Sequence, residues 1–244
     1  MRYILLFFAS VFSLANTPAD DPIQTLIDEG RDAEAYAMAQ SSADAGNARG
    51  HEWLGWMYEE GRGVEANLRL AVSHYREAIT GGRNHARWRV GVLIDQGEAE
   101  GTLEEAVALF EEAARDNFTN AMVSLAVMKA TGRGTPTDYP GALEFYMRAA
   151  RMGNAHGVQG VGVLLMLGQG IDKNPEEAAA WFLTSAMAGN ETGRIHFERA
   201  IAGMSEEQVR AIIARANDLA SEFGVDAASI YESDQGEGGE EPIG

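Results

Sequence analysis

The chain of 244 residues contains no cysteine, which excludes disulfides, thiolate metal ligands and cysteine nucleophiles. Basic residues are also scarce: 19 stand against 37 acidic ones, which gives a net charge of −18 at pH 7. Nearly all of them are arginine, because Lys129 and Lys173 are the only lysines. So acidic a surface repels phosphate backbones, and we therefore expect no nucleic-acid partner.

Long apolar runs are missing except at the N-terminus. Met1 and Arg2 precede a mostly apolar stretch at 3–14, which is shorter than the roughly 20 residues that a membrane helix needs. Ser13 and Ala15 provide the small residues of a cleavage site. We expect a signal peptide over 1–15, export, and a periplasmic or secreted location in a bacterium. A buried first helix or an uncleaved anchor are the alternatives.

Catalytic and metal-binding patterns are absent as well. No two of the five histidines are four residues apart, no H-E-x-x-H motif occurs, and no serine lies in a nucleophile-elbow context. Adjacent glutamates such as Glu176 and Glu177 point in different directions on a helix, where they are typical of a solvated face. We therefore expect no catalytic residue, no metal and no cofactor.

What the sequence does have is a repeat. Glycines at one position recur with spacings of 36, 35 and 36 residues, and three further positions keep the same step. These four sets are Gly61, Gly97, Gly132 and Gly168; Gly55, Gly91, Ala126 and Gly162; Ala71, Ala106, Ala142 and Ala178; Tyr75, Phe110, Tyr146 and Phe182. A period in the mid-thirties is typical of stacked units that cannot bury their apolar faces alone.

Each repeat reads as helix, tight turn, helix. Glycines such as Gly168 stand where a helix end requires a left-handed residue. The second helices begin at favoured N-cap residues, which are Asn67, Thr102, Asp138 and Asn174. Capping boxes are predicted for Thr102 with Glu105, Asn174 with Glu177 and Ser205 with Gln208.

The pattern predicts an all-α fold, a right-handed α-solenoid of antiparallel helix pairs with a period of 35–36. Its repeats span about 47–82, 83–117, 118–153 and 154–189. Capping helices are expected over 32–45 and 191–222, so the solenoid covers 32–222. A linker or partial helix precedes it at 16–31. An acidic disordered tail is expected over 223–244, because 232–244 carries five acidic residues and no basic one.

The repeats resemble the SEL-like (Sel-one-like) repeat family, which is related to tetratricopeptide repeats. The first repeat matches its pattern at Leu54, Gly55, Tyr58, Gly61, Gly63, Val64, Ala71, Tyr75 and Ala78. The fourth matches at Gly162, Gly168, Gly170, Ala178, Trp181, Phe182 and Gly189. The second lacks the second loop glycine, and the third has Ala126 for glycine and Lys129 for tyrosine. The resemblance implies an adaptor or regulator rather than one fixed activity.

The first helices of such a superhelix line its concave side, which suggests a binding groove. Counting from the packed Leu-Gly dipeptide, the lining residues that we expect to bind are Arg49, Glu52, Trp56, His85, Trp88, Val92, Val123, Val127, Gln159, Val163 and Met166. An exposed apolar strip on a soluble protein usually marks a partner site. The alternative is that strong curvature buries these residues between first helices.

From the sequence we therefore expect a non-enzymatic, exported scaffold or adaptor that binds a protein or peptide partner through its concave groove, with a regulatory role as one variant of this function. A periplasmic hydrolase acting on cell-wall material is the alternative. It would require a convergent pair of acidic residues with a raised pKa in the groove.

Overall fold

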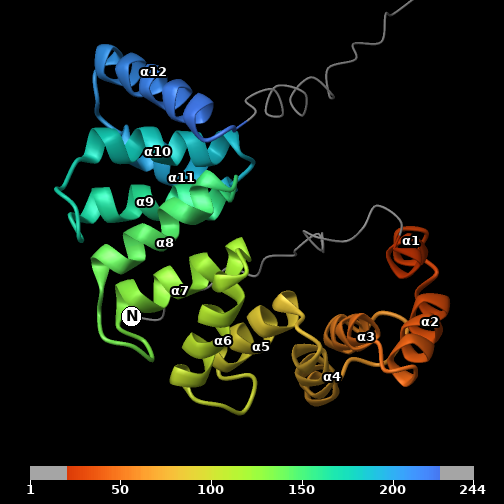
Figure 1. The fold of residues 1–244 in the computed structure, drawn as a ribbon. Helices are drawn as coiled ribbons and strands as arrows, with labels where there is room; N and C mark the ends of the chain where they lie inside the picture. Colours follow the sequence, from red (N-terminus) through yellow and green to blue (C-terminus); the bar gives the residue numbers. More distant parts are fainter. Residues whose placement is uncertain (1–20, 226–244) are drawn as a thin grey trace, which may run out of the picture. The chain divides into compact units, whose positions relative to one another are not determined.

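The computed structural model describes residues 21–225, and this part of the chain is all α-helical, with twelve helices and no strand (Figure 1). The expected signal peptide at 1–15 and most of the expected tail lie outside the described residues. The chain divides into two compact units within α5, at Val90 and Gly91. We call residues 21–90 the N-terminal unit and residues 91–225 the C-terminal unit.

The helices follow the expected alternation. The N-terminal unit contains α1 (Pro22–Asp28), α2 (Asp32–Asp44), α3 (Ala48–Glu60), α4 (Leu68–Thr80) and the start of α5 (Asn84–Gln96). The C-terminal unit continues with α6 (Leu103–Arg115), α7 (Thr119–Thr131), α8 (Tyr139–Arg151), α9 (Ala155–Leu167), α10 (Pro175–Met187), α11 (Glu191–Ala200) and α12 (Glu206–Glu222). Sequential helices pair with each other, as in α3 with α4 and α9 with α10.

Side-chain caps start the second helix of each repeat, as predicted. The Oδ1 atom of Asn174 accepts a hydrogen bond of 3.0 Å from the backbone N–H of Glu177. The caps at Asn67, Thr102 and Asp138 do the same for the third residue after them. These bonds satisfy backbone donors that have no partner within the helix. A reciprocal capping box joins Ser205 and Gln208.

Left-handed glycines end the first helices. Gly168 has φ 70° and its backbone N–H bonds to the carbonyl of Leu164, so the predicted stop is confirmed there. Gly61 and Gly132 end α3 and α7 in the same conformation. A side chain is disfavoured at such an angle, which explains why glycine recurs with the repeat.

A second glycine lets the two helices of a repeat approach closely. A Cβ atom on Gly55 would lie 2.6 Å from the ring of Tyr75, which is fully buried. Gly162 stands in the same relation to Phe182, at 2.7 Å. The aromatic ring therefore occupies the space that a side chain would fill, and the same contact joins Gly91 and Phe110 in the second repeat.

Both ends of the folded part extend beyond the expected solenoid. In the N-terminal unit, α1 buries Ile23, Leu26 and Ile27 and is capped by Asp21. At the other end α12 lies on α10 (Figure 1). Phe223 is buried there and its ring lies 5.1 Å from that of Trp181, so the core reaches into the first residue of the segment expected to be a tail. Trp53 and Trp181 are buried in the core.

Candidate functional site

Two residues of the expected groove are buried in the N-terminal unit. Glu52 is 0% exposed and Trp56 is 8% exposed, so neither presents its side chain to a partner, and the prediction is wrong for both. The guanidinium of Arg62 lies over the ring of Trp56, 5.7 Å from its centroid. Arg49, His85 and Trp88 are half-buried.

Glu52 is the acidic end of a buried ion pair. Its Oε2 accepts hydrogen bonds from the Arg83 guanidinium, with Nε at 2.7 Å. The Nδ1 atom of His85 lies 3.6 Å from Oε1. Burial alone would raise the pKa of Glu52, but His85 and Arg83 outweigh it and hold the pKa below its usual range. The carboxylate is therefore an ionised structural group.

A second pair lies about two helical turns further along α3, at Glu59. The hydroxyl of Tyr75 donates to Glu59 over 2.8 Å, and Arg89 pairs with the same carboxylate. Burial raises the pKa of Tyr75 well above 10, and the negative charge of Glu59 adds to this effect. Burial opposes the charge on Arg89, but Glu59 outweighs it and the pKa of Arg89 is raised. The charged side chains on this face of α3 therefore pair with one another.

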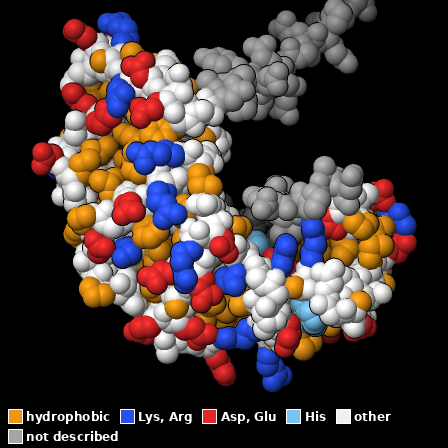
Figure 2. All heavy atoms as spheres, viewed as in Figure 1, with side chains coloured by type: hydrophobic (Ala, Val, Ile, Leu, Met, Phe, Trp, Pro, Cys, Tyr) orange, Lys and Arg blue, Asp and Glu red, His pale blue; other side chains and the backbone are white. Residues whose placement is uncertain are grey.

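The first helices of the C-terminal unit differ, because apolar side chains remain partly open. Val127 on α7 is 38% exposed. Val123 on α7 and Val163 and Met166 on α9 are partly buried and pack on the core beneath them. Val92 is half-buried at the start of this unit. Figure 2 shows hydrophobic side chains at the surface over α9 and α10, crossed by basic ones.

A ladder of amides and imidazoles runs beside these apolar residues. The Nδ2 atom of Asn190 donates to Gln159 Oε1 over 2.8 Å, and Gln159 Nε2 lies 3.3 Å from Nδ1 of His196. The Nδ2 atom of Asn154 likewise donates to Oδ1 of Asn120 in the previous repeat, over 3.0 Å. Half-burial lowers the pKa of His196, so its ring is neutral near pH 7.

Sequence reasoning missed this ladder, although a signal was present. The residue before each first helix recurs with the repeat spacing: Asn47, Arg83, Phe118, Asn154 and Asn190. It is asparagine in three of the five cases. Arg83 and Asn190 each reach the residue 31 positions earlier, which is Glu52 or Gln159. Arg83, Asn154 and Asn190 therefore each link one repeat to the previous one.

A hydrolytic site would need a carboxyl with a raised pKa and a second carboxylate beside it. Asp95 on α5 has a pKa that burial raises, but its carboxylate pairs with Arg133 at 2.6 Å. A single ion-paired carboxyl does not provide the two roles that glycoside hydrolysis requires. Within residues 21–225, no group of three or more His, Asp or Glu side chains is arranged to hold a metal ion.

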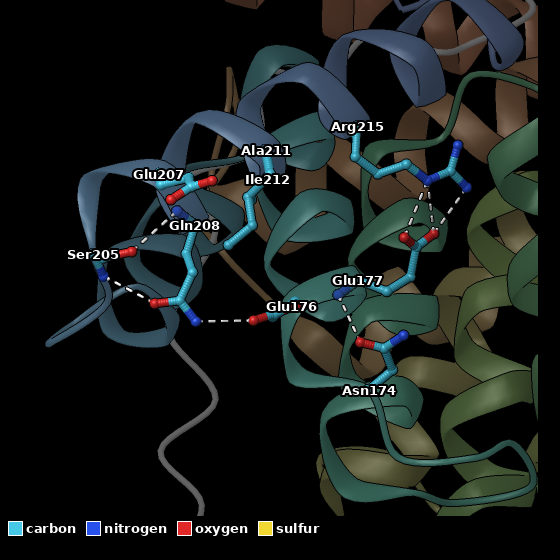
Figure 3. A pocket seen from close by; sticks show the side chains of 9 residues that line it. All are labelled: Asn174, Glu176, Glu177, Ser205, Glu207, Gln208, Ala211, Ile212 and Arg215. Carbon is cyan, nitrogen blue, oxygen red and sulfur yellow. Dashed lines mark hydrogen bonds and ion pairs between the residues drawn. The ribbon is translucent and has the colours of Figure 1, made fainter.

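An open cleft of about 390 Å³ lies where α10 and α12 begin (Figure 3). Its polar groups are paired across the cleft: Arg215 with Glu177 at 2.8 Å, and Gln208 with Glu176 at 3.0 Å. The amide oxygen of Asn174 caps α10 beside them. These bonds attach the last helix to the repeat before it, which is a structural role.

A family model for the Sel1 repeat matches residues 48–82, 85–118, 119–154 and 159–190, more than half of the chain. The chain belongs to the Sel1 repeat family. The four matches fall on the helix pairs α3 to α10, and the resemblance inferred from the repeated glycines is confirmed. Sel1 repeat proteins are scaffolds for protein interaction.

The similar proteins agree on the fold. Crystal structures of c5321, a protective antigen of uropathogenic Escherichia coli, and of a Sel1 repeat protein from Oxalobacter formigenes give TM-scores of 0.73 and 0.69. The first is 21% identical, with 86% of this chain and 45% of that chain covered. The second is 24% identical, with 81% and 83% covered. Both show an α-solenoid of Sel1-like repeats, so the predicted all-α solenoid is confirmed.

A curated relative is the uncharacterized protein NMB1327 of Neisseria meningitidis serogroup B, which is 28% identical over 156 residues. The match covers 64% of this chain but only 32% of that protein, so the chain spans about a third of its length. None of the helices in residues 21–225 is long and apolar enough to cross a bilayer.

Proposed function

We propose that this Sel1 repeat chain is a non-enzymatic, exported adaptor that binds a protein or peptide partner on the first helices of its C-terminal unit. The observation that carries the proposal is the partly open apolar strip of Val123, Val127, Val163 and Met166, which lies on α7 and α9. The strip is bordered by the polar ladder of Asn120 and Gln159 on the same helices.

Contact with the apolar strip would supply the binding affinity, and the hydrogen-bonded ladder would keep the surface around the strip rigid. Val123, Val163 and Met166 already pack on the core, so these side chains have little conformational freedom left to lose when a partner binds. Gln159 is held at both ends of its amide, by Asn190 and by His196, which keeps the neighbouring surface rigid. A preformed surface of this kind suits an extended segment or an amphipathic helix.

The N-terminal unit contributes differently. Its equivalent positions are occupied by the buried Glu52 and Trp56, so the binding strip that we propose excludes them. Export rests on the basic start, the short apolar run and the small residues before Asn16 in the sequence. Cell fractionation followed by N-terminal sequencing tests that part: a mature protein beginning at Asn16 supports it, and a cytoplasmic protein that retains Met1 overturns it.

The binding strip is tested with a matched pair of charge substitutions. Val127→Asp places a carboxylate in the strip, and Ile213→Asp does the same on α12, where Ile213 is 42% exposed. Both residues are open apolar side chains of the C-terminal unit, so both substitutions should leave the fold intact. Partners captured from the native source by wild-type protein are identified by mass spectrometry, and affinity is then measured with each purified partner.

We expect Val127→Asp to weaken binding by at least about 2 kcal/mol, the size of an interface hot spot. Ile213→Asp should bind as wild type does. Equal binding by both variants, with both folded, would exclude the strip on α7 and α9 as the site. Loss of binding in Ile213→Asp alone would move the site to α12.

A further inference from the structure

The fold brings together two histidines that are far apart in the sequence. His51 on α3 and His74 on α4 lie with their Nδ1 atoms 3.1 Å apart, and their ring centroids are 5.4 Å apart. Both side chains are half-buried, so solvent and small ions reach them. Neither residue belongs to the strip proposed above, which lies in the other unit.

The spacing of the two nitrogens fits a shared metal ion. Imidazole nitrogens bind Zn²⁺ at about 2.0–2.1 Å, which places two ligands of one ion about 2.9–3.4 Å apart for angles between a right angle and the tetrahedral angle. The observed 3.1 Å lies within that range. Without a metal the same distance is a hydrogen bond in which one ring donates from Nδ1.

The surrounding side chains hold one ring in place. Tyr58 stacks on His74 with ring planes 6° apart and centroids 5.5 Å apart. The hydroxyl of Tyr58 is in turn hydrogen bonded to that of Tyr36 on α2, at 2.8 Å. A ligand ring whose orientation is fixed in advance loses little freedom on binding, which favours coordination.

The electrostatic surroundings of His74 favour a neutral imidazole ligand and a bound cation. Burial, and then the neighbouring His51, lower the pKa of His74 below 6.5, so the ring carries no charge at pH 7. Neutral imidazole is the form that binds metals. The carboxylate of Glu77, three residues along α4, acts on His74 in the opposite sense and adds negative charge nearby.

We propose that His51 and His74 form a binding site for a divalent transition metal that favours imidazole, such as Zn²⁺ or Cu²⁺. The protein supplies two nitrogens and water completes the coordination, which makes the site an exchangeable one. Binding requires the donating ring to move its proton from Nδ1 to Nε2. This change of tautomer moves one proton within the ring and frees its Nδ1 lone pair for the metal.

The test is titration of the full chain with ZnCl₂ at pH 7.5 by calorimetry. We expect one ion per chain for wild type. His74→Phe keeps a ring to stack on Tyr58 but removes the nitrogen, and His51→Gln removes the other ligand. Even the loss of a hydrogen-bond partner behind a metal ligand typically weakens affinity about 10–100-fold, so each variant should lose at least about tenfold.

The matched control is His196→Phe, which removes a half-buried neutral histidine from the C-terminal unit and should leave zinc binding unchanged. Electron paramagnetic resonance of bound Cu²⁺ gives a second measure, with two coupled nitrogens in wild type and one in His74→Phe. Zinc binding that is equal in wild type and His74→Phe, or absent from wild type, overturns the proposal. Circular dichroism confirms that each variant is folded.

Discussion

The two units use different chemistry for the side chain that links one repeat to the previous one. In the N-terminal unit, Arg83 reaches back 31 residues to Glu52 and forms a buried ion pair. In the C-terminal unit, Asn190 occupies the equivalent position and reaches back 31 residues to Gln159 with a neutral amide. The same link between repeats is therefore charged in one unit and uncharged in the other.

The difference decides what each surface can do. The two charges of a buried ion pair must stay together, because a buried charge without a partner is costly. Arg49 with Asp21 and Arg89 with Glu59 continue that pattern on α3. The neutral amides of the C-terminal unit allow valines and a methionine to remain partly open between them. The charged side chains of the N-terminal unit pair with one another, whereas Val127 in the C-terminal unit remains 38% exposed.

Truncation of the two hydrogen-bond acceptors, Glu52 and Gln159, should give the largest difference between the two units. Glu52→Ala leaves Arg83 without its partner in the buried pair, and we expect a loss of about 3–5 kcal/mol in the free energy of unfolding. Gln159→Ala removes a neutral acceptor and should cost about 1–3 kcal/mol. Urea denaturation followed by hydrogen exchange with mass spectrometry measures each unit separately.

Equal costs for Glu52→Ala and Gln159→Ala would show that the charge adds nothing to the link. Glu52→Gln is the control for size, because it keeps the shape and removes the charge. Three of the four tryptophans, Trp53, Trp56 and Trp88, lie in the N-terminal unit, so fluorescence reports mainly on that unit.

Packing inside a repeat should not differ between the units, and matched glycine substitutions test this. Gly55→Ala and Gly162→Ala each place a methyl group within 2.6–2.7 Å of a buried aromatic ring, Tyr75 or Phe182. Overpacking of this kind typically costs about 1–3 kcal/mol. Thermal melts of the two variants should show losses of similar size. A tolerated substitution in one unit only would mean that its helices can move apart.

Acid should affect the two links in different pH ranges. The folded-state pKa of Glu52 is below its ordinary 4.5, so its contribution is present above that value and is lost as the pH falls through the folded pKa. Burial lowers the pKa of His156 and His196 below 6.5. The unfolded chain takes up those protons first, so stability falls as the pH drops below about 6.5.

Unfolding measured between pH 7.5 and 3.5 checks both statements. Glu52→Gln should differ from wild type in slope only below about pH 4.5, whereas His196→Phe should reduce the slope just below pH 6.5. His74 in the N-terminal unit also has a lowered pKa and adds to the upper range, so the variants are compared with wild type rather than with each other. A slope change for Glu52→Gln above pH 6 would contradict the assignment.

The repeat and its helix boundaries could be predicted because their causes are local. Asn174 caps a helix three residues away, and Gly168 ends one through its own backbone angle. Gly55 and Tyr75 were also visible in the sequence as recurring positions, and the structure shows that only a residue without a side chain fits against the ring. Local bonds of this kind depend on a few dihedral angles, which the residue type restricts strongly.

The candidate site was predicted only in part. The positions on the first helices of the C-terminal unit follow from helical phase, and the structure leaves Val127 open there. The same phase placed Glu52 and Trp56 on the surface, because periodicity cannot tell whether a long arginine side chain from the next repeat covers a position. In the N-terminal unit Arg83 covers Glu52 in this way, and Arg62, from the turn after α3 in the same repeat, lies over Trp56.

By itself the sequence determined the family, the helix pairs and the acidic balance of this chain, since each depends on neighbouring residues or on composition. Only the tertiary structure decided which unit has ion pairs on its first helices and which unit keeps apolar side chains partly exposed there. It alone brought His51 within 3.1 Å of His74, which lies on the next helix and 23 residues away. Such encounters depend on side-chain rotamers at packed helix faces, and the pattern of residue types does not contain them.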